Sequence, residues 1–333
     1  MPDATASVVF VDVGTVGAHA RWCAGLTVLE RSLREAERRG TSRAIVPAAP
    51  IALRPDLAVA VEWVRPGTAP PVGVEVIRGD LVAGVEVVDV ASERTAERAL
   101  IAGLGKSHEG PVDQFFNSIF SRPITRALMR TSIRPNHITL VATAIGLAGA
   151  IILLSATWLA IAVAGTLLEI QCILDSCDGE IARLKHQGSK LGQWLDTLTD
   201  GLLDNAFVAC AAVVAGGIWL PLGLALVAAR LVVEVYVYLD VYRRTGTPDQ
   251  AQFRMWYEDE SAGVDQIYDR TSFNSWLRSA GRRDVYVAAY WLFCLAGLPV
   301  GVVVYAGVMN AITFVGVCMD IVMKRVIAAR QSR

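Results

Sequence analysis

The sequence lacks an excess of either charge. It has 31 Lys and Arg residues against 32 Asp and Glu residues, which gives a formal net charge of −1. No tract of Lys or Arg departs from that balance, so the sequence gives no support for a nucleic-acid partner. Cysteine is also scarce: the six cysteines form no CxxC pair and mostly lie in apolar segments. Neither a disulfide framework nor a zinc site is therefore expected.

No secretory leader is expected. The first residues, MPDATASVVF, have no basic region followed by an apolar core and a cleavage site. We therefore expect the first domain to stay in the cytoplasm. Three long stretches of the later chain lack charged residues: residues 138–168, 205–229 and 285–319 contain no Asp, Glu, Lys or Arg. With 53% hydrophobic residues and a mean hydropathy of +0.43, the chain is expected to include a membrane portion.

The first 110 residues mix Val and Ala with many charged residues, unlike the chain that follows. Their short Val-rich runs, typical of strands, lie at 7–13, 58–64, 72–77 and 81–90. A segment with helical periodicity occupies residues 26–39. This order predicts a small α/β cytoplasmic domain over residues 1–110.

An amphipathic segment follows this domain. GLGKSHEG at residues 103–110 predicts a linker, and apolar residues recur at helical spacing in the segment 111–134 behind it. Arg122, Arg126 and Arg130 occupy another face of that helix. The pattern predicts an amphipathic interfacial helix lying on the membrane surface.

The charge-free stretches are long enough for more than one span each. A spanning helix needs about 20 residues, so residues 138–168 and 285–319 are interpreted as hairpins of two helices. The stretch 205–229 is completed by the segments on either side of it. The expected turns lie at residues 155–158, 216–221 and 297–301. Residues 135–333 are therefore predicted to form an all-α polytopic membrane domain of six transmembrane helices.

The distribution of basic residues predicts the orientation. All three turns lack Lys and Arg, whereas the opposite ends of the helices are basic. By the positive-inside rule, the N- and C-termini and the Asp-rich loop face the cytoplasm. The expected location is the inner (cytoplasmic) membrane, as an integral multi-pass protein. The polar segment 245–284 is expected to connect the fourth and fifth spans on the cytoplasmic side.

Five aspartates lie beside the second and third spans, at positions 175, 178, 196, 200 and 204. Carboxylates at this depth are unfavourable unless they are paired or bind a cation. On helices, Asp175 and Asp178 are three residues apart and the others are four apart, so each set projects from one face. Two such faces brought together form an oxygen-lined site for hard divalent cations, of which Mg²⁺ is usual beside phosphates.

The spacing of these aspartates forms a larger pattern, D-x2-D-G-x2-A-R-x8-G-x3-D-x3-D. It is made by Asp175, Asp178, Gly179, Ala182, Arg183, Gly192, Asp196 and Asp200. Over roughly residues 112–330 the chain resembles the CDP-alcohol phosphotransferase family, whose signature it matches at every defined position. The resemblance implies six transmembrane helices, usually a homodimer, and a site open to the cytoplasm. It also implies a pair of divalent ions, Mg²⁺ or Mn²⁺.

The resemblance assigns roles to individual aspartates. Asp175, Asp178 and Asp196 resemble the family's metal ligands. Asp200 resembles the residue that contributes to the second ion and acts as general base. Asp204 continues the acidic face one turn further. For Asp204, and for Glu169, Arg230 and Glu234 in or beside the spans, both ion pairing and ligand contact stay open.

A second set of residues resembles the family's contacts with the cytidine diphosphate: Gly179, Ala182, Arg183 and Ser189. Asn136 and Thr139, in the PNHIT segment that opens the first span, match another nucleotide-contacting stretch. For Asn136 an ordinary helix start, which Pro-Asn also signals, is the alternative.

The resemblance predicts an enzyme that transfers substituted phosphate groups. A phosphoalcohol group, phosphatidyl or polyol phosphate, would move from a CDP-alcohol to an acceptor hydroxyl with release of CMP. Phospholipid or inositol-phosphate-type synthesis is the expected setting, with membrane lipid as a further partner. The signature does not identify the acceptor. The alternative outside enzymes is an ion-coupled transporter, although a transporter gives no reason for Gly179, Arg183 and Gly192 at these spacings.

The N-terminal domain carries a weaker resemblance. Residues 9–40 resemble the opening strand, Gly-rich loop and helix of sugar-phosphate nucleotidyltransferases: Gly14 and Gly17 remain, Arg21 is displaced, and residues 25–29 are similar to the helix start. Asp80 resembles the metal-binding aspartate. The domain is about half as long as a working member of that fold. Such fusions occur in enzymes that make CDP-inositol and join it to inositol phosphate. We interpret the domain as degenerate and inactive; a bifunctional enzyme with cytidylyltransferase activity is the alternative.

Overall fold

The computed structural model describes residues 7–14, 17–104, 110–246, 252–257 and 280–331. The chain divides into two compact units. The first consists of Met1–Leu104, Arg126–Ser132 and Ile181–Gln187, and the second of Gly105–Thr125, Ile133–Glu180 and Gly188–Arg333. Most of the predicted linker at 103–110 and of the polar connection at 245–284 lies outside the described residues.

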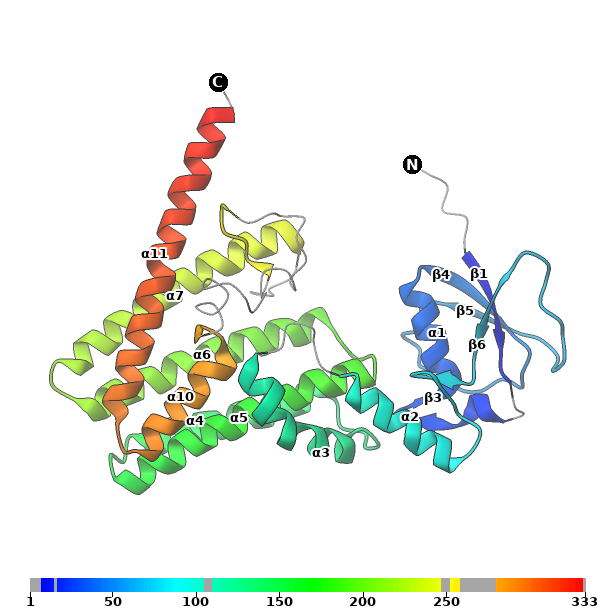
Figure 1. The fold of residues 1–333 in the computed structure, drawn as a ribbon, viewed down its shortest axis with the longest axis horizontal. Helices are drawn as coiled ribbons and strands as arrows, with labels where there is room; N and C mark the ends of the chain where they lie inside the picture. Colours follow the sequence, from blue (N-terminus) through cyan, green and yellow to red (C-terminus); the bar gives the residue numbers. More distant parts are fainter. Residues whose placement is uncertain (1–6, 15–16, 105–109, 247–251, 258–279, 332–333) are drawn as a thin grey trace. The chain divides into compact units, whose positions relative to one another are not determined.

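The first unit is built on a parallel sheet with strand order β5-β4-β1-β6 (Figure 1). Its strands are β1 (Ser7–Asp12), β4 (Thr41–Val46), β5 (Ala60–Trp63) and β6 (Glu75–Arg78). Helix α1 (Val28–Arg38) buries Leu29 and Leu33 against Val9 and Val11 of the central strand. The predicted small α/β fold is confirmed.

A short connection leads from β1 to α1. It contains the 3-10 turn η1 (Ala18–Ala20) and the two-residue strands β2 (Trp22–Cys23) and β3 (Leu26–Thr27), which pair with each other. Thr27 then caps α1, because its hydroxyl oxygen accepts a hydrogen bond from the Glu30 amide at 3.2 Å.

The prediction of one strand over residues 81–90 is wrong. The segment forms a hairpin of β7 (Leu81–Val82) and β8 (Val85–Glu86), followed by helix α2 (Val90–Ala102). The chain reverses at Ala83 and Gly84, which have φ angles of 48° and 79°. Asp89 and Ser92 form a capping box that starts α2. Strand β4 was not predicted, because Arg43 interrupts its apolar pattern.

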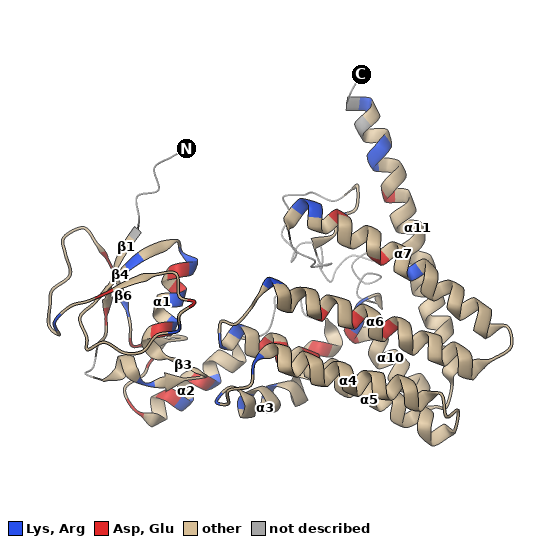
Figure 2. Ribbon diagram, turned by 180° about the vertical axis from the view of Figure 1, so that it is seen from behind, with Lys and Arg blue, Asp and Glu red and all other residues tan. Residues whose placement is uncertain are grey.

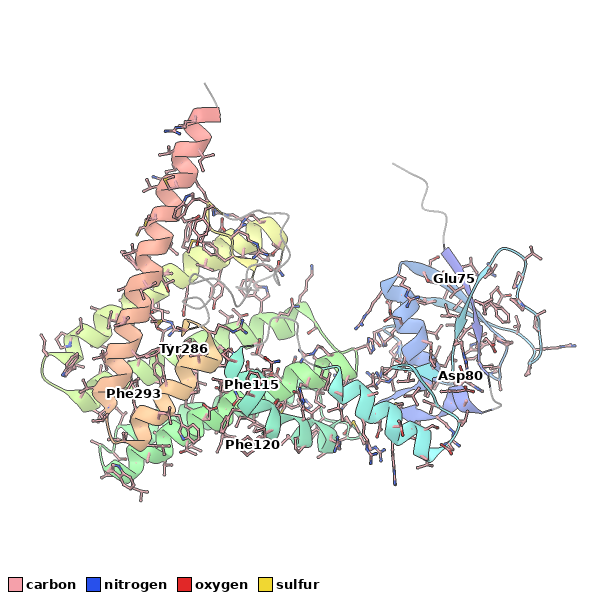
Figure 3. All side chains as sticks on the ribbon, in the orientation of Figure 1. Glu75, Asp80, Phe115, Phe120, Tyr286 and Phe293 are labelled. Carbon is pink, nitrogen blue, oxygen red and sulfur yellow. The ribbon has the colours of Figure 1, made fainter. Side chains whose placement is uncertain are left out.

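The segment predicted as an interfacial helix contains a π-helical turn η2 (Asp113–Asn117) and helix α3 (Ser118–Leu128). Its buried face is polar: the hydroxyls of Ser121 and Thr125 both donate to the carboxylate of Glu180. Its apolar side chains point outward, with Phe115 65% and Phe120 46% exposed (Figure 3). An outward apolar face fits contact with lipid, and the interfacial location stays a prediction.

Five helices in the described part of the chain are long and apolar enough to cross a membrane. They are α4 (Pro135–Leu153), α5 (Trp158–Leu184), α6 (Lys190–Ala215), α7 (Trp219–Thr245) and α11 (Pro299–Gln331). Figure 2 shows long stretches of α4, α5 and α7 without charged residues. These helices fit a multi-pass membrane protein, and the breaks between them confirm the predicted turns after Leu153 and Ala215.

The sixth predicted span is not among these helices. Its place is taken by α10 (Arg283–Leu295), which has 13 residues. At 1.5 Å per residue that is about 20 Å, short of the roughly 30 Å of a bilayer core. The helix ends because Gly297 has a φ angle of 70° and Pro299 follows it, which separates α10 from α11.

Small residues bring the helices of the second unit close together. A Cβ atom on Gly146 of α4 would lie 2.3 Å from Leu203 of α6, and one on Gly165 of α5 would lie 2.4 Å from Cys294 of α10. Between α6 and α10 the rings of Phe207 and Tyr290 stack at 6.4 Å. The same close packing of α5, α6 and α10 positions the polar residues of the candidate site.

Candidate active site

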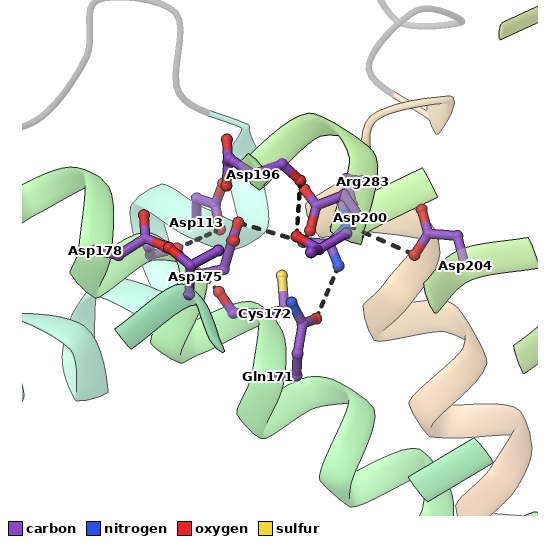
Figure 4. Close-up of polar contacts among 12 residues, drawn as sticks. Asp113, Gln171, Cys172, Asp175, Asp178, Asp196, Asp200, Asp204 and Arg283 are labelled. Atoms are coloured by element: carbon purple, nitrogen blue, oxygen red, sulfur yellow. Dashed lines mark hydrogen bonds and ion pairs between the residues drawn. The ribbon is translucent and has the colours of Figure 1, made fainter. Parts of the chain in front are cut away.

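Three aspartates meet between two helices of the second unit (Figure 4). Asp175 and Asp178 project from α5, and Asp196 projects from α6. One carboxylate oxygen from each lies within 4.8 Å of the other two. The helical spacing therefore produces the predicted convergence.

These carboxylates fit a divalent cation. Mg²⁺ binds oxygen ligands at about 2.0–2.1 Å, so ligands on opposite sides of the ion lie about 4 Å apart. The three oxygens, one from each carboxylate, lie within 4.8 Å of one another, close to this separation. Oδ1 of Asp175 is also buried and receives no hydrogen bond from any residue that the structure describes. A bound cation would satisfy this oxygen.

Arg283 is the residue that the sequence interpretation missed. At the first position of α10, its guanidinium lies 3.3 Å from Asp175 Oδ2, 3.0 Å from Asp200 Oδ1 and 3.5 Å from Asp204 Oδ1. It also donates a hydrogen bond of 2.8 Å to Gln171 Oε1, as Figure 4 shows. From the sequence, Arg283 counted only among the basic residues at the helix ends that indicate membrane orientation. Its place two residues before a charge-free stretch was the available signal.

Asp200 differs from the other three predicted metal ligands. Its carboxylate pairs with Arg283 and is not part of the group of three. It still follows Asp196 by one helical turn on α6, so it faces the same space between the helices. Arg283 here balances the mutual repulsion of carboxylates on α5 and α6.

The acidic residues beyond the signature form ion pairs. Asp204 Oδ2 lies 3.0 Å from a guanidinium nitrogen of Arg230 and also accepts a hydrogen bond from the Tyr286 hydroxyl. Arg230 in turn pairs with Glu234 at 2.7 Å. This network favours the ion-pairing interpretation of Asp204, Arg230 and Glu234. Glu169 is buried, and its carboxylate has no hydrogen-bond partner among the described residues.

The structure brings some of the predicted nucleotide-contacting residues together. Ser189 caps α6, because its hydroxyl accepts a hydrogen bond of 3.0 Å from the Gly192 amide. A Cβ atom on Gly192 would lie 3.1 Å from both Ser189 Oγ and Asn136 Oδ1. Thr139 instead donates a hydrogen bond to Asp178 Oδ2. Thr139 therefore orients a candidate metal ligand.

The other predicted nucleotide-contacting residues lie on α5. Gly179 directly follows Asp178, and Ala182 and Arg183 lie in the last turn. The helix closes immediately afterwards: the Gln187 amide donates to Ala182 O at 2.9 Å, and His186 takes a left-handed conformation with a φ angle of 49°. Arg183 thus lies at a sharply terminated helix end.

In the N-terminal domain, the aspartate predicted to resemble a metal ligand is already paired. Asp80 is fully buried, and its two oxygens accept hydrogen bonds from Arg78 at 2.9 and 2.7 Å. Gly14 packs so closely that a Cβ atom there would lie 2.0 Å from Asp80 Oδ2. Gly17 has a φ angle of 84° and precedes η1. Residues 15 and 16 of the loop lie outside the described residues.

Comparison with known families agrees with this site. A model of the CDP-alcohol phosphatidyltransferase family matches residues 132–254. The matched segment contains α4 to α7 and with them Asp175, Asp178, Asp196 and Asp200. The match to this family model confirms the predicted resemblance for residues 132–254.

Curated relatives match part of the chain. The chain is 35% identical over 120 residues to the bifunctional IPC transferase and DIPP synthase of Archaeoglobus fulgidus, a match that covers 36% of this chain and 24% of that protein. Proteins of the same name from Thermococcus kodakarensis and Rubrobacter xylanophilus are each 31% identical, over 121 and 147 residues. Those matches cover 36% and 43% of this chain, and 26% and 33% of the relatives. The similarity thus spans a quarter to a third of each relative's length.

Proposed function

We propose that this protein transfers a phosphoalcohol group from a CDP-alcohol to an acceptor hydroxyl and releases CMP. The observation that supports this most is the convergence of Asp175, Asp178 and Asp196, at the spacing of the signature, within the segment that matches the family. Carboxylates this close together beside apolar helices are unfavourable unless a cation is bound.

Each residue of the signature has a part in this proposal. Asp175, Asp178, Asp196 and Asp200 would hold two divalent ions, Mg²⁺ or Mn²⁺. Bound there, these ions supply charge neutralisation for the diphosphate and polarise its phosphorus atom. Arg183 would bind phosphate oxygens, for which its planar donors are suited. Gly179, Ala182, Ser189 and Asn136 would line the cytidine diphosphate.

The reaction needs no nucleophile from the protein. The acceptor oxygen forms a bond to the phosphorus next to the alcohol, and the bond from that phosphorus to the CMP oxygen breaks. Asp200 would take the acceptor's proton on a carboxylate oxygen. Arg283, now 3.0 Å from Asp200 Oδ1, must share or release that carboxylate before the proton moves.

Chelation tests this proposal directly. Purified protein is incubated with CDP-inositol or CDP-diacylglycerol and a panel of hydroxyl acceptors, and CMP and the product are identified by mass. We expect CMP release that excess chelator abolishes and that Mg²⁺ or Mn²⁺ restores. Full activity in excess chelator would overturn the metal-dependent mechanism. No CMP from any pair of substrates would argue against the proposed reaction.

A bifunctional enzyme is the second candidate, because the relatives' names describe two activities. In that case the N-terminal domain would make a CDP-alcohol from CTP. The bidentate pairing of Asp80 with Arg78 argues against it, since both carboxylate oxygens are engaged. Pyrophosphate release from CTP and an alcohol phosphate would support bifunctionality, and its absence beside CMP release would support a single activity.

The remaining features of the proposal concern assembly. We propose six crossings, with the short α10 as the fifth, both termini in the cytoplasm, and a homodimer in the membrane. The basic residues opposite the uncharged turns support this orientation. Labelling of an engineered cysteine at position 155 from the cytoplasmic side alone would contradict it. The mass of the detergent-solubilised protein tests the dimer.

A further inference from the structure

The end of α5 is held by the N-terminal domain. The segment Ile181–Gln187, which includes Arg183, belongs to the first compact unit together with residues 1–104. Two arginines of the N-terminal domain reach it: Arg31 donates to Leu184 O at 2.9 Å, and Arg54 donates to Lys185 O at 3.0 Å. Both bonds end on backbone carbonyls, so they constrain the backbone directly.

The same two arginines are fixed at their other side. Arg31 also donates to Cys23 O at 2.8 Å and Ala24 O at 2.7 Å, and Arg54 donates to Gly25 O at 2.8 Å. These carbonyls belong to the turn between β2 and β3. Each guanidinium therefore joins this turn to the end of α5, and the rigid, multi-donor geometry of arginine suits such a bridge.

These contacts complete the hydrogen bonding of the helix end. The last carbonyls of an α-helix have no partners within the helix. Here, Ile181 O accepts from the Lys185 amide and Ala182 O accepts from the Gln187 amide. The carbonyls of Leu184 and Lys185, two buried residues, accept from the two arginines. A positive side chain is also favoured there by the helix dipole.

Further contacts hold this segment within the same unit. The Lys185 ammonium donates to Thr131 O at 2.8 Å and Leu128 O at 3.2 Å. A guanidinium nitrogen of Arg38 lies 3.0 Å from His186 Nδ1. The last turn of α5 is therefore fixed at several consecutive residues, whereas helix ends usually fray.

We propose that the N-terminal domain is a positioning domain for the nucleotide-binding end of α5, acting through Arg31 and Arg54. The inference rests on the proposed function, in which Arg183 binds the diphosphate of the CDP-alcohol. Arg183 directly precedes Leu184 and follows Asp178 by five residues on one continuous helix. Fixing the carbonyls at 184 and 185 holds the last turn in helical form and so constrains the backbone that carries the Arg183 side chain.

This role needs no chemistry in the N-terminal domain. It explains how a domain whose Asp80 is paired with Arg78 can serve the reaction of the membrane unit. Arg31 and Arg54 are positioning residues, since neither is proposed to contact the substrate.

The test replaces Arg54 by Met in the full-length protein, which keeps the length of the side chain and removes its donors. The matched control is Arg43→Met, because Arg43 lies on β4 of the same domain and pairs only with the exposed Glu62 in the described contacts. Binding of CDP in Mg²⁺ is measured by calorimetry, CMP release gives KM and kcat, and hydrogen exchange reports on the amides at 185–188.

We expect Arg54→Met to weaken CDP binding and raise KM about tenfold, the effect of losing a bond worth about 1.4 kcal/mol. The kcat value should change less, and exchange at 185–188 should become faster while the thermal unfolding midpoint stays near that of Arg43→Met. Arg54→Lys has a single nitrogen that cannot donate to both Gly25 O and Lys185 O. Its CDP affinity and KM should lie between those of the unchanged protein and those of Arg54→Met.

Two outcomes would overturn the inference. One is Arg54→Met with CDP affinity and KM equal to those of Arg43→Met. The other is a loss of CDP affinity that Arg54→Lys and Arg43→Met share in full, which would indicate general loosening of the domain. If Arg54→Met fails to fold, the same comparison is made with Arg54→Lys, and CDP affinity and KM equal to those of Arg43→Met would overturn the inference. Absence of CMP release by the unchanged protein would instead refute the proposed function, whereas CDP binding would still test the positioning role.

Discussion

The two units of this protein treat their carboxylates in opposite ways. In the first unit, Asp80 is buried and both its oxygens are paired with Arg78, two residues away. In the second unit, five aspartates lie on α5 and α6, and the described ion pairs of Arg230 and Arg283 reach three of them, Asp175, Asp200 and Asp204. The first case is a local pair of opposite charges, and the second is a concentration of acidic residues.

The acidic residues of the second unit are informative because they lie on the apolar helices α5 and α6. Carboxylates inside apolar helices are unfavourable without counter-charge, so an acidic excess there indicates a cation that belongs to the site. The local pair of Asp80 and Arg78 differs, because both carboxylate oxygens already accept a hydrogen bond from a cation. This contrast supports the proposal that the chemistry lies in the membrane unit.

The largest expected effect is that of Asp196→Asn. It removes one of three converging carboxylates and with it the several kcal/mol of charge stabilisation that a divalent ion supplies, so CMP release should fall about 10³-fold or more. Mn²⁺ binding by calorimetry should weaken in parallel. Unchanged Mn²⁺ affinity would remove Asp196 from the ligand set.

Asp80→Asn is the matching substitution in the first unit and tests whether that carboxylate also contributes to the reaction. Asp80→Asn breaks the pair with Arg78 and should lower the free energy of unfolding by about 1–3 kcal/mol, the effect of disturbing a buried charged hydrogen bond. CMP release by the folded variant should stay near that of the unchanged protein. A loss as large as that of Asp196→Asn would contradict the assignment of chemistry to the membrane unit alone.

Asp200→Asn separates proton transfer from metal binding. If Asp200 mainly removes the acceptor's proton, turnover should fall about 10²–10⁴-fold, the usual contribution of a positioned general base. CDP-alcohol affinity should be largely retained, and Mn²⁺ affinity should fall less than for Asp196→Asn. Near-normal turnover would exclude Asp200 as the base and direct attention to Asp204.

Arg283→Gln tests the counter-charge inside the cluster. The guanidinium of Arg283 lies within 3.5 Å of three carboxylates and repels any cation that approaches them. Removing this charge should tighten Mn²⁺ binding in the absence of nucleotide about tenfold. Arg283→Lys keeps the charge and should retain the weaker affinity. Weaker Mn²⁺ binding in Arg283→Gln would mean that Arg283 organises the ligands more than it repels the ion.

The sequence was sufficient to predict the convergence of Asp175, Asp178 and Asp196, because helical periodicity and the signature act over short distances. Arg283 could not be placed in this way, since 108 residues separate it from Asp175 and only the packing of α10 on α5 brings them together. The separation of Asp200 from the group of three follows from that same contact.

Local signals also explain the errors in the fold. The Val-rich run at 81–90 was predicted as one strand because of its apolar residues. That pattern does not reveal the turn, which depends on the backbone angles of Ala83 and Gly84. The stretch at 285–319 breaks at the turn predicted for 297–301, which leaves the 13-residue α10 before it and the long α11 after it.

The smallest expected effect is a pH dependence of the first unit, centred on His186. Arg38 lies 3.0 Å from His186 Nδ1. Because arginine donates and does not lose its proton, Nδ1 must accept, so the imidazole is neutral. Burial, and then the neighbouring Arg38, lower the pKa of His186 from 6.5 to about 4.

The direction of the effect follows from this lowered pKa. In the unfolded chain His186 binds a proton below about pH 6.5, whereas in the folded protein it does so only below about pH 4. The contribution of the neutral imidazole to stability is therefore fully present above pH 6.5 and is lost as the pH falls toward 4.

The variant His186→Asn removes this titration, and asparagine suits the left-handed backbone at that position. Hydrogen exchange of the amides at 185–188 is measured in the full-length protein at pH 7 and pH 4.5 and corrected for intrinsic exchange rates. In the unchanged protein, exchange should be faster at pH 4.5 than at pH 7. In the variant this acid-induced increase should be smaller. Comparing the two proteins at each pH cancels the titration of the carboxylates, which both share. Equal acid loosening in the two proteins would mean that His186 does not couple the end of α5 to pH, and that the contacts of Arg31 and Arg54 alone govern it.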